Sequence, residues 1–470
     1  MPSDPKTLAA QAQSLKAQGR LSEALSLYRD AVAAAPESAS AEHNLAAALG
    51  DAGRWPEAER HMRAAFAKGA SAPESWLVLA RCLQARGAFN EAERAFRTAL
   101  ERRPTFADAH LDLAQLLWIR TGDATQALAE IERALAAQPE HPSLLLVRAR
   151  ILENTRGVSA AYDIADRLVR LAPDDLAAVV YASQLAAQLG DDASALGHAD
   201  HATRLAPLNP VVSVALITAC LAAGDAARAA THATLLLQRA PHDQHAIALL
   251  ATAWRMLGDP RYRTIYDYGA LVRTSILETP AGWPSLPAYL ADLKLALARA
   301  HISTTHPFNQ SVRHGSQAPD VLGIDDRAVA ALPAALASSI MRYVESLGAG
   351  DDPLRRRNFG GYAFQGMWSI RMQSGGHHVD HVHPNGWISS ACYIEVPDAL
   401  PGQEGWIRFG APGIRTSPAL GAEHVVAPKP GMLVLFPSYM WHGVNPYTTP
   451  ATRMTFAFDL APARRAGAVA

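Results

Sequence analysis

A pattern of small residues recurs about every 34 residues through the first half of the chain. Most copies carry an alanine five residues after a glycine, and a proline follows in nearly all of them. The alanine lets two helices pack closely, the glycine ends the first helix in a turn with positive φ, and the proline stops the second. Such helix pairs can bury their apolar faces only by stacking on their neighbours. The glycines are Gly19, Gly53, Gly87, Gly122, Gly157, Gly190 and Gly224.

This repeat resembles the tetratricopeptide repeat. About seven copies span residues 5–258, with a capping helix over 244–257. The first four copies match the pattern well, and the last three keep glycine and proline in phase. An irregular alanine-rich bundle would not hold seven copies in register. The resemblance implies an all-α superhelix whose concave groove holds a peptide or protein partner.

The repeats stop at Gly258-Asp259-Pro260, where the composition changes. We predict a helical linker over 259–304, including a helix at 285–301. The remaining region, 305–463, is expected to begin with a helix at about 325–347 and then to become rich in strands. Domains with a β-barrel core commonly have helices packed on the outside of the barrel.

From Phe364 onward the pattern changes to short β runs separated by glycine and proline. Many short strands of this kind predict a double-stranded β-helix, or jelly roll, with flanking helices. The whole chain is therefore predicted to be an all-α superhelix followed by an α+β domain. The predicted strands are Met367–Met372, Val379–His383, Ile388–Val396, Trp406–Phe409, Met432–Phe436 and Thr452–Asp459.

The strand-rich region contains a cluster of histidines that is typical of a metal site. His381 and His383 are two residues apart, so on a strand both face the same side. His442 is a distant third histidine, and Arg453 follows it by eleven residues. Two ligands at i and i+2, a third histidine and then a basic residue form the layout of a non-haem iron oxygenase, in which Fe(II) keeps open positions for a 2-oxoacid and dioxygen.

A second frame for the metal ligands exists in the same stretch. His378 and Asp380 form a His-x-Asp pair, which would give the commoner triad of two histidines and one carboxylate. The segment Pro384-Asn385-Gly386-Trp387, directly after His383, favours the pair His381/His383. In that frame all three ligands are histidines, and the centre carries one negative charge fewer.

Several polar residues are candidates for binding the 2-oxoacid. The guanidinium of Arg453 suits a bidentate pair with the distal carboxylate of 2-oxoglutarate, and Thr455 faces the same side of its strand. Tyr393 and Ser389 have matching strand parity, so both can project into the barrel and donate hydrogen bonds to the co-substrate. Arg371, on the strand before the histidines, is a weaker candidate.

From His306 to about Pro462 the chain is similar to the bacterial 2-oxoglutarate/Fe(II) oxygenase family often found behind tetratricopeptide repeats. The resemblance implies a jelly roll and a dioxygenase that hydroxylates its substrate, with Fe(II), 2-oxoglutarate and O2. His381, His383, His442 and Arg453 stand at the family's matching positions. The stretches that carry the resemblance are His306–Gly315, Trp368–Arg371, Gly375–His377, His381–Pro384, Gly405–Gly410 and Pro430–Val444.

Two other classes of protein compete with this interpretation. A cupin also uses His-x-His and a later histidine, but it usually adds a glutamate shortly afterwards, and Trp387-Ile388-Ser389 offers none. A cupin also has no need for Arg453. The other competitor is a repeat-based interaction scaffold whose barrel is inactive.

Charge and cysteine content limit which binding partners and which cellular compartment are expected. Lys and Arg total 43 against 44 Asp and Glu, so nucleic acid and anionic membranes are not expected partners. Three cysteines without paired spacing, and an N-terminus without a secretion signal, suit a reducing cytoplasm. Nothing in the sequence indicates an oligomeric state.

Overall fold

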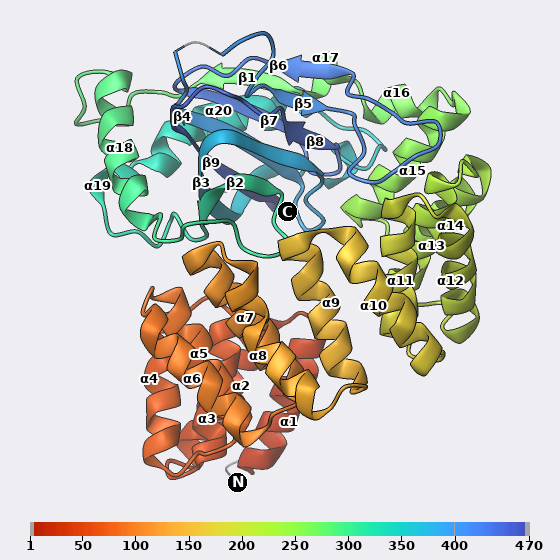
Figure 1. Ribbon diagram of the computed structural model, residues 1–470. Coiled ribbons are helices and arrows are strands. Elements are labelled where there is room, and N and C mark those ends of the chain that lie inside the picture. Colours follow the sequence, from red (N-terminus) through yellow and green to blue (C-terminus); the bar gives the residue numbers. More distant parts are fainter. Residues whose placement is uncertain (1–3, 399, 466–470) are drawn as a thin grey trace. The chain divides into compact units, whose positions relative to one another are not determined.

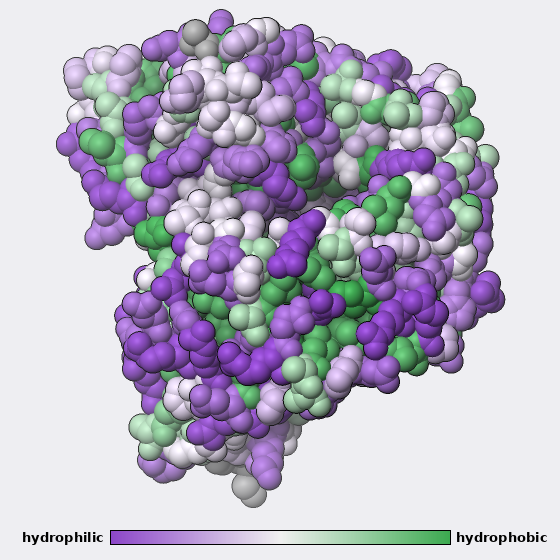
Figure 2. Space-filling model, viewed as in Figure 1, coloured by the Kyte–Doolittle hydropathy of each residue, from purple (hydrophilic) through white to green (hydrophobic). Residues whose placement is uncertain are grey.

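The computed structural model describes residues 4–398 and 400–465. The chain forms two compact units, Met1–Arg156 and Gly157–Ala470 (Figure 1). The first unit contains helices only, and the second combines further helices with a curled β-sheet. Hydrophilic side chains cover most of the surface visible in Figure 2. Among the described residues, none of the helices has both the length and the apolar character needed to span a membrane.

The first unit is a row of antiparallel helix pairs. The repeated alanines Ala24, Ala58 and Ala92 are completely buried, which confirms their predicted role in close helix packing. The turn glycines Gly53 and Gly87 have φ values of 70° and 77°, which an alanine would adopt only with strain. The helices are α1 (Pro5–Ala17), α2 (Leu21–Ala34), α3 (Ala39–Asp51), α4 (Trp55–Ala67), α5 (Pro73–Ala85), α6 (Phe89–Arg102), α7 (Ala107–Thr121), α8 (Ala124–Ala137) and α9 (Pro142–Arg156).

The second unit begins with six more helices of the same kind. Aspartates at helix N-termini, such as Asp175, Asp191 and Asp225, accept hydrogen bonds from backbone N–H groups and so fix where each helix starts. The last helix of the series coincides with the predicted capping helix. These helices are α10 (Val158–Leu171), α11 (Leu176–Leu189), α12 (Asp192–Leu205), α13 (Pro210–Ala222), α14 (Ala226–Arg239) and α15 (Gln244–Leu257).

After two short helices, α16 (Arg261–Ile265) and α17 (Tyr268–Leu271), the chain builds one antiparallel sheet. Its order is β1-β7-β4-β9-β3-β8-β5-β6, and β2 pairs with β3 outside this path. The predicted class, a helical superhelix followed by a jelly-roll region with flanking helices, is confirmed. The strands are β1 (Arg273–Ile276), β2 (Val312–Ala318), β3 (Gly360–His381), β4 (Ile388–Glu395), β5 (Ile407–Phe409), β6 (His424–Val426), β7 (Met432–Pro437), β8 (His442–Val444) and β9 (Arg453–Arg464).

The two faces of β9 separate the core from the site. Phe456 and Phe458 point to one face and join a buried cluster with apolar residues of α18 (Leu286–Ala300) and α20 (Leu332–Leu347). Because side chains alternate along a strand, Arg453, Thr455 and Asp459 lie on the opposite face. The helices therefore cover one side of the sheet and leave the other for the candidate site.

The strand boundaries differ from the predicted ones in one important place. The predicted strands 367–372 and 379–383 belong to a single strand, β3, although Ser374-Gly375-Gly376 reads as a turn. β3 continues because β2 pairs with it on both sides of this segment, while its other partner changes from β9 to β8. It ends at His381, so His383 lies just beyond it, in a turn.

The predicted linker, 259–304, contributes to the sheet as well as to the helices. Its residues Arg273–Ile276 form β1 and pair with β7, and α18 packs into the same buried cluster. The predicted helix at 325–347 is split into α19 (Arg327–Ala330) and α20, whose first turn contains Pro333. The division into 5–258, 259–304 and 305–463 stays a prediction.

Candidate active site

Three histidines meet at one point of the second unit. One ring nitrogen from each of His381, His383 and His442 lies within 4.8 Å of the others. The Nε2 atoms of His381 and His383 are 3.3 Å apart. Two nitrogens that each bind one cation at about 2.1 Å are separated by roughly 3.0–3.4 Å, so this spacing suits a shared metal ion.

Strand pairing brings these distant residues together. His381 ends β3 and His442 begins β8, and the two are direct partners across the antiparallel pair. His383 follows in the turn, where its backbone N–H donates to the carbonyl of Ser438 at 3.0 Å. That bond ties the turn to the segment that leads into His442.

Each of the three imidazoles uses its Nδ1 in a hydrogen bond to an oxygen that can only accept. His381 donates to the Val379 carbonyl at 2.9 Å, and His442 donates to the Met440 carbonyl at 2.9 Å. His383 donates to the Asp459 carboxylate at 2.8 Å. Nδ1 therefore carries the proton in all three rings, which leaves each Nε2 with a lone pair that can bind a metal ion. The Nε2 of His381 also lies 3.3 Å from the Ser311 hydroxyl.

Burial also keeps two of these imidazoles neutral. It lowers the pKa of His381 to about 3, and the neighbouring His383 acts in the same direction. The pKa of His442 falls well below its ordinary value for the same two reasons, with His381 and His383 as its neighbours. Neutral imidazole is the form that binds a metal ion.

Arg453 is a buried cation without a counterion among the described residues. Only 2% of it is exposed, and its Nε has no hydrogen-bond partner there. Its guanidinium lies 5.1 Å from the centroid of the Tyr393 ring, and its Nη1 meets only the sulfur of Met372 at 3.8 Å. A buried, unpaired charge is costly, so this arrangement calls for an anionic ligand.

The Tyr393 hydroxyl beside Arg453 is likewise buried and has no hydrogen-bond partner among the described residues. Burial raises the pKa of Tyr393 to about 12, so the hydroxyl keeps its proton and can donate it in a hydrogen bond. Thr455 is buried on the same face of β9, two residues after Arg453. A carboxylate placed here would satisfy both Arg453 and Tyr393.

Ser389 lies on the site face of β4, beside Asp459. Its hydroxyl donates to the Asp459 carboxylate at 2.7 Å and contacts the Ser438 hydroxyl at 2.9 Å. Ser389 is therefore behind His383, and its polar atom is already engaged. Asp459 itself was missed by the sequence analysis, although strand alternation from Arg453 places it on the site face.

The alternative ligand pair is not assembled. Asp380 forms a bidentate ion pair with Arg408, at 2.9 and 2.7 Å, and does not belong to the metal-compatible group. His378 hydrogen bonds through Nδ1 to the Ser311 hydroxyl at 2.8 Å. Arg371 is directly opposite Met454 on β9, on the face of the sheet that does not carry Arg453.

The segment before His442 is anchored to the helices. Trp441 donates from its indole Nε1 to Thr252 Oγ1 on α15 at 3.0 Å, and from its backbone N–H to the Tyr266 hydroxyl at 3.0 Å. The Tyr266 hydroxyl in turn donates to the Tyr439 carbonyl at 3.0 Å. His442 is thus positioned from the repeat side of this unit as well as by the sheet.

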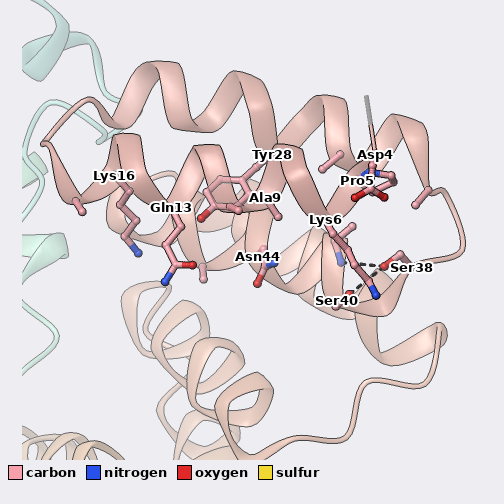
Figure 3. Close-up of a pocket in the computed structure, with 16 residues that line it drawn as sticks. Asp4, Pro5, Lys6, Ala9, Gln13, Lys16, Tyr28, Ser38, Ser40 and Asn44 are labelled. Atoms are coloured by element: carbon pink, nitrogen blue, oxygen red, sulfur yellow. Dashed lines mark hydrogen bonds between the residues drawn. The ribbon is translucent and has the colours of Figure 1, made fainter. Parts of the chain in front are cut away.

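The first unit has a separate groove of about 870 Å³ between α1, α2 and α3. Figure 3 shows polar side chains along it, and Tyr28 adds an aromatic surface. Both basic and uncharged polar groups are available to a bound chain. The polar residues are Asp4, Lys6, Gln13, Lys16, Ser38, Ser40 and Asn44.

Family models match both the repeat region and the strand-rich region of the chain. Tetratricopeptide-repeat matches cover residues 15–82, 51–115 and 83–151, and residues 366–459 match the family described as "Putative 2OG-Fe(II) oxygenase". The chain therefore contains tetratricopeptide repeats and a domain of that oxygenase family. No curated protein sequence matches the chain at a significant level.

Solved structures similar to this chain include two that are described as tetratricopeptide-repeat proteins. A tetratricopeptide repeat protein from Parabacteroides merdae is 18% identical, with 53% of this chain and 98% of that chain covered, at a TM-score of 0.38. The Thermus thermophilus protein TTC0263 is 22% identical, with 38% and 97% covered, at a TM-score of 0.32. Pseudomonas aeruginosa pilF is 18% identical, with 44% and 94% covered, at a TM-score of 0.32.

Proposed function

We propose that the chain is a 2-oxoglutarate- and Fe(II)-dependent dioxygenase that hydroxylates a peptide or protein substrate. The observation that carries the proposal is the pairing of two incomplete sites: three ring nitrogens that can share a metal ion, and a buried guanidinium without a counterion among the described residues. A metal ion completes the first and a dicarboxylic acid completes the second. The match to the oxygenase family favours Fe(II) with 2-oxoglutarate for this pair of ligands.

His381, His383 and His442 would hold the metal ion on one face. Bound Fe(II) supplies the activation of dioxygen: O2, 2-oxoglutarate and a substrate C–H group give succinate, CO2 and the hydroxylated substrate. Arg453 would pair with the distal carboxylate of 2-oxoglutarate, and Tyr393 would donate a hydrogen bond to it. Thr455 lies where it can contact the same co-substrate.

The apolar side chains around these groups would exclude water. Val312, Ile370, Met372 and Tyr447 form a small buried cluster that Trp368 joins from its edge. Trp368 also stacks on His383, with ring centroids 5.5 Å apart. A low-dielectric lining strengthens the pairing of Arg453 with a carboxylate and leaves the metal-binding nitrogens accessible.

The repeats supply the argument for a peptide or protein substrate. Tetratricopeptide repeats generally mediate protein–protein interaction, and the groove between α1 and α3 offers hydrogen-bonding side chains along its length. A peptide held by its backbone in such a groove would be concentrated near the enzyme. We expect cytoplasmic substrates.

The test begins with the purified protein under anaerobic conditions. We expect one Fe(II) per chain, 2-oxoglutarate binding that requires Arg453, and succinate formation when O2 is admitted. His381→Ala should abolish metal binding, and His232→Ala, on the repeat helix α14, should not. A protein that binds no metal yet retains a peptide partner after His381→Ala would instead be a repeat scaffold with an inactive barrel.

A further inference from the structure

Asp459 is placed to act on the metal centre without touching the metal. Its carboxylate lies 2.8 Å from His383 Nδ1, and the two side chains are only 15% and 13% exposed. Both carboxylate oxygens lie 2.8 Å from His383 Nδ1, and Oδ1 also accepts a hydrogen bond from Ser389 at 2.7 Å. The carboxylate is therefore fixed from two sides, by the imidazole and by the Ser389 hydroxyl.

A second layer of contacts fixes this carboxylate further. The Ser438 hydroxyl lies 2.9 Å from that of Ser389, and the Ser438 carbonyl accepts the backbone N–H of His383. Gly386 packs against the Ser438 hydroxyl so closely that a Cβ at position 386 would lie 2.3 Å from Ser438 Oγ. The chain around His383 is thus shaped to keep the Asp459 carboxylate in position.

The three candidate ligands differ in this respect. His381 and His442 donate their Nδ1 protons to neutral backbone carbonyls two residues earlier in the chain. His383 alone donates to a carboxylate. It is also the ligand that lies beyond the end of β3, where no strand pairing fixes its orientation.

We propose that Asp459 is a positioning residue that supplies, through His383, the negative charge that a ligand carboxylate provides in the commoner triad. The proposal rests on the proposed function, since it assumes that the three histidines hold a metal ion. A carboxylate acceptor fixes the tautomer and the ring plane of His383 and makes its Nε2 a stronger donor. The charge is then one hydrogen bond away from the metal.

The test compares metal binding by the full chain and by variants of this network. Co(II) is the probe, because its visible spectrum reports the ligand field while its titration gives the affinity. Asp459→Asn keeps the size of the side chain and an accepting oxygen but removes the charge, and we expect Co(II) to bind about 10- to 100-fold more weakly with a shifted spectrum. Ser389→Ala, which leaves the carboxylate less firmly held, should give a smaller change in the same direction.

Ser390→Ala is the matched control. Ser390 is the next residue on β4 and is also buried, but its hydroxyl donates to the Phe458 carbonyl on the other face. We expect its Co(II) affinity and spectrum to equal those of the wild type. Thermal unfolding without metal identifies any variant that is weakened only because it is poorly folded.

The outcomes separate the two proposals. If the wild-type chain does not bind Co(II), the proposed function fails. If the wild type binds Co(II) and folded Asp459→Asn binds it with the same affinity and spectrum, Asp459 is not a positioning residue, and the dioxygenase proposal stands. Weak binding by Ser390→Ala equal to that of Ser389→Ala would also overturn the role of the network.

Discussion

The indole Nε1 of Trp441 donates a hydrogen bond to Thr252 Oγ1 across 3.0 Å, although the two residues are 189 positions apart in the sequence. Thr252 belongs to α15, the helix that closes the repeat series, and Trp441 immediately precedes the candidate ligand His442. The buried cluster around them runs without interruption from the last repeats into the sheet. The metal site is therefore supported by the repeats of its own unit.

Removing this hydrogen bond should weaken the metal site. In Thr252→Val the indole N–H of Trp441 is left buried without its partner, which costs about 1–3 kcal/mol. We expect a lower Tm and a several-fold loss of Co(II) affinity. Thr231→Val is the control. Thr252 and Thr231 each donate a hydrogen bond to the backbone carbonyl four residues earlier, but Thr231 is exposed on α14. Equal effects of the two substitutions would show that the contact with Trp441 is unimportant.

Truncation should reveal where the folding unit begins. A fragment of residues 305–463 lacks β1, which pairs with β7, and α18, which covers the sheet. We expect it to be unfolded or aggregated, because an apolar face and a strand edge are uncovered. The fragment 157–470 retains these elements and should bind one Co(II). Circular dichroism and metal titration of both fragments check this, and a folded, metal-binding 305–463 would contradict it.

Replacing the unpaired cation should separate stability from co-substrate binding. Arg453→Met removes a buried charge that has no counterion among the described residues, so the protein without 2-oxoglutarate should become more stable, by about 1 kcal/mol or more. The same change should reduce 2-oxoglutarate affinity about 100-fold, because the charged partner of its carboxylate is lost. Thermal unfolding with and without 2-oxoglutarate measures both effects.

The exposed Arg342 is a suitable control for this experiment. It lies on α20, pairs with Glu278 at the surface and donates a hydrogen bond to the Ser339 hydroxyl. Arg342→Gln should change neither quantity appreciably. A stabilisation by 2-oxoglutarate that survives in Arg453→Met would place the co-substrate elsewhere.

His301 should make the stability depend on pH in the acidic range. It is buried between the hydroxyls of Ser316 and Ser369, at 2.8 and 3.0 Å. Burial lowers its pKa from 6.5 to about 4, and the positive charge of Arg371 adds to the effect. Below pH 6.5 the unfolded chain takes up a proton that the folded chain refuses, so stability falls as the pH drops from 6.5 to 4.

The measurement is the free energy of unfolding by denaturant over this range. The loss attributable to His301 should be on the order of 3 kcal/mol by pH 4. His301→Gln has no proton to gain, so its stability should decline less steeply over the same interval. Parallel pH profiles for the wild type and the variant would argue that His301 is already protonated in the folded state.

Much of the fold was readable from the sequence because its determinants are local. The spacing of Gly53 and Gly87, with Ala58 and Ala92 between the helices, defines the repeats before any contact is known. The alternation along 452–459 predicted a strand with Arg453 on one face. The single strand β3 was not predicted, because Gly375-Gly376 has the composition of a turn. The strand continues there because β2 pairs with it on both sides of the segment, while its other partner changes from β9 to β8.

Some features of the candidate site could likewise be predicted from the sequence, and others could not. The spacing of His381, His383 and His442 indicated a metal centre, since ligand chemistry depends on residue type. The sequence left two possible sets of metal ligands. In the structure the Asp380 carboxylate pairs with Arg408 and does not belong to the group of three histidines. The role of Ser389 was likewise decided by its neighbour Asp459, which no local pattern connects to His383.

The amino-acid order by itself determined the repeat class, the strand-rich second half and the residue types of the candidate centre, because periodicity and side-chain chemistry are properties of short segments. The tertiary structure alone decided which oxygen each imidazole contacts, that no described residue is a counterion for Arg453, and that α15 holds the residue before His442. Those relationships join positions far apart in the chain, and they arise only when strand pairing and burial bring the side chains together.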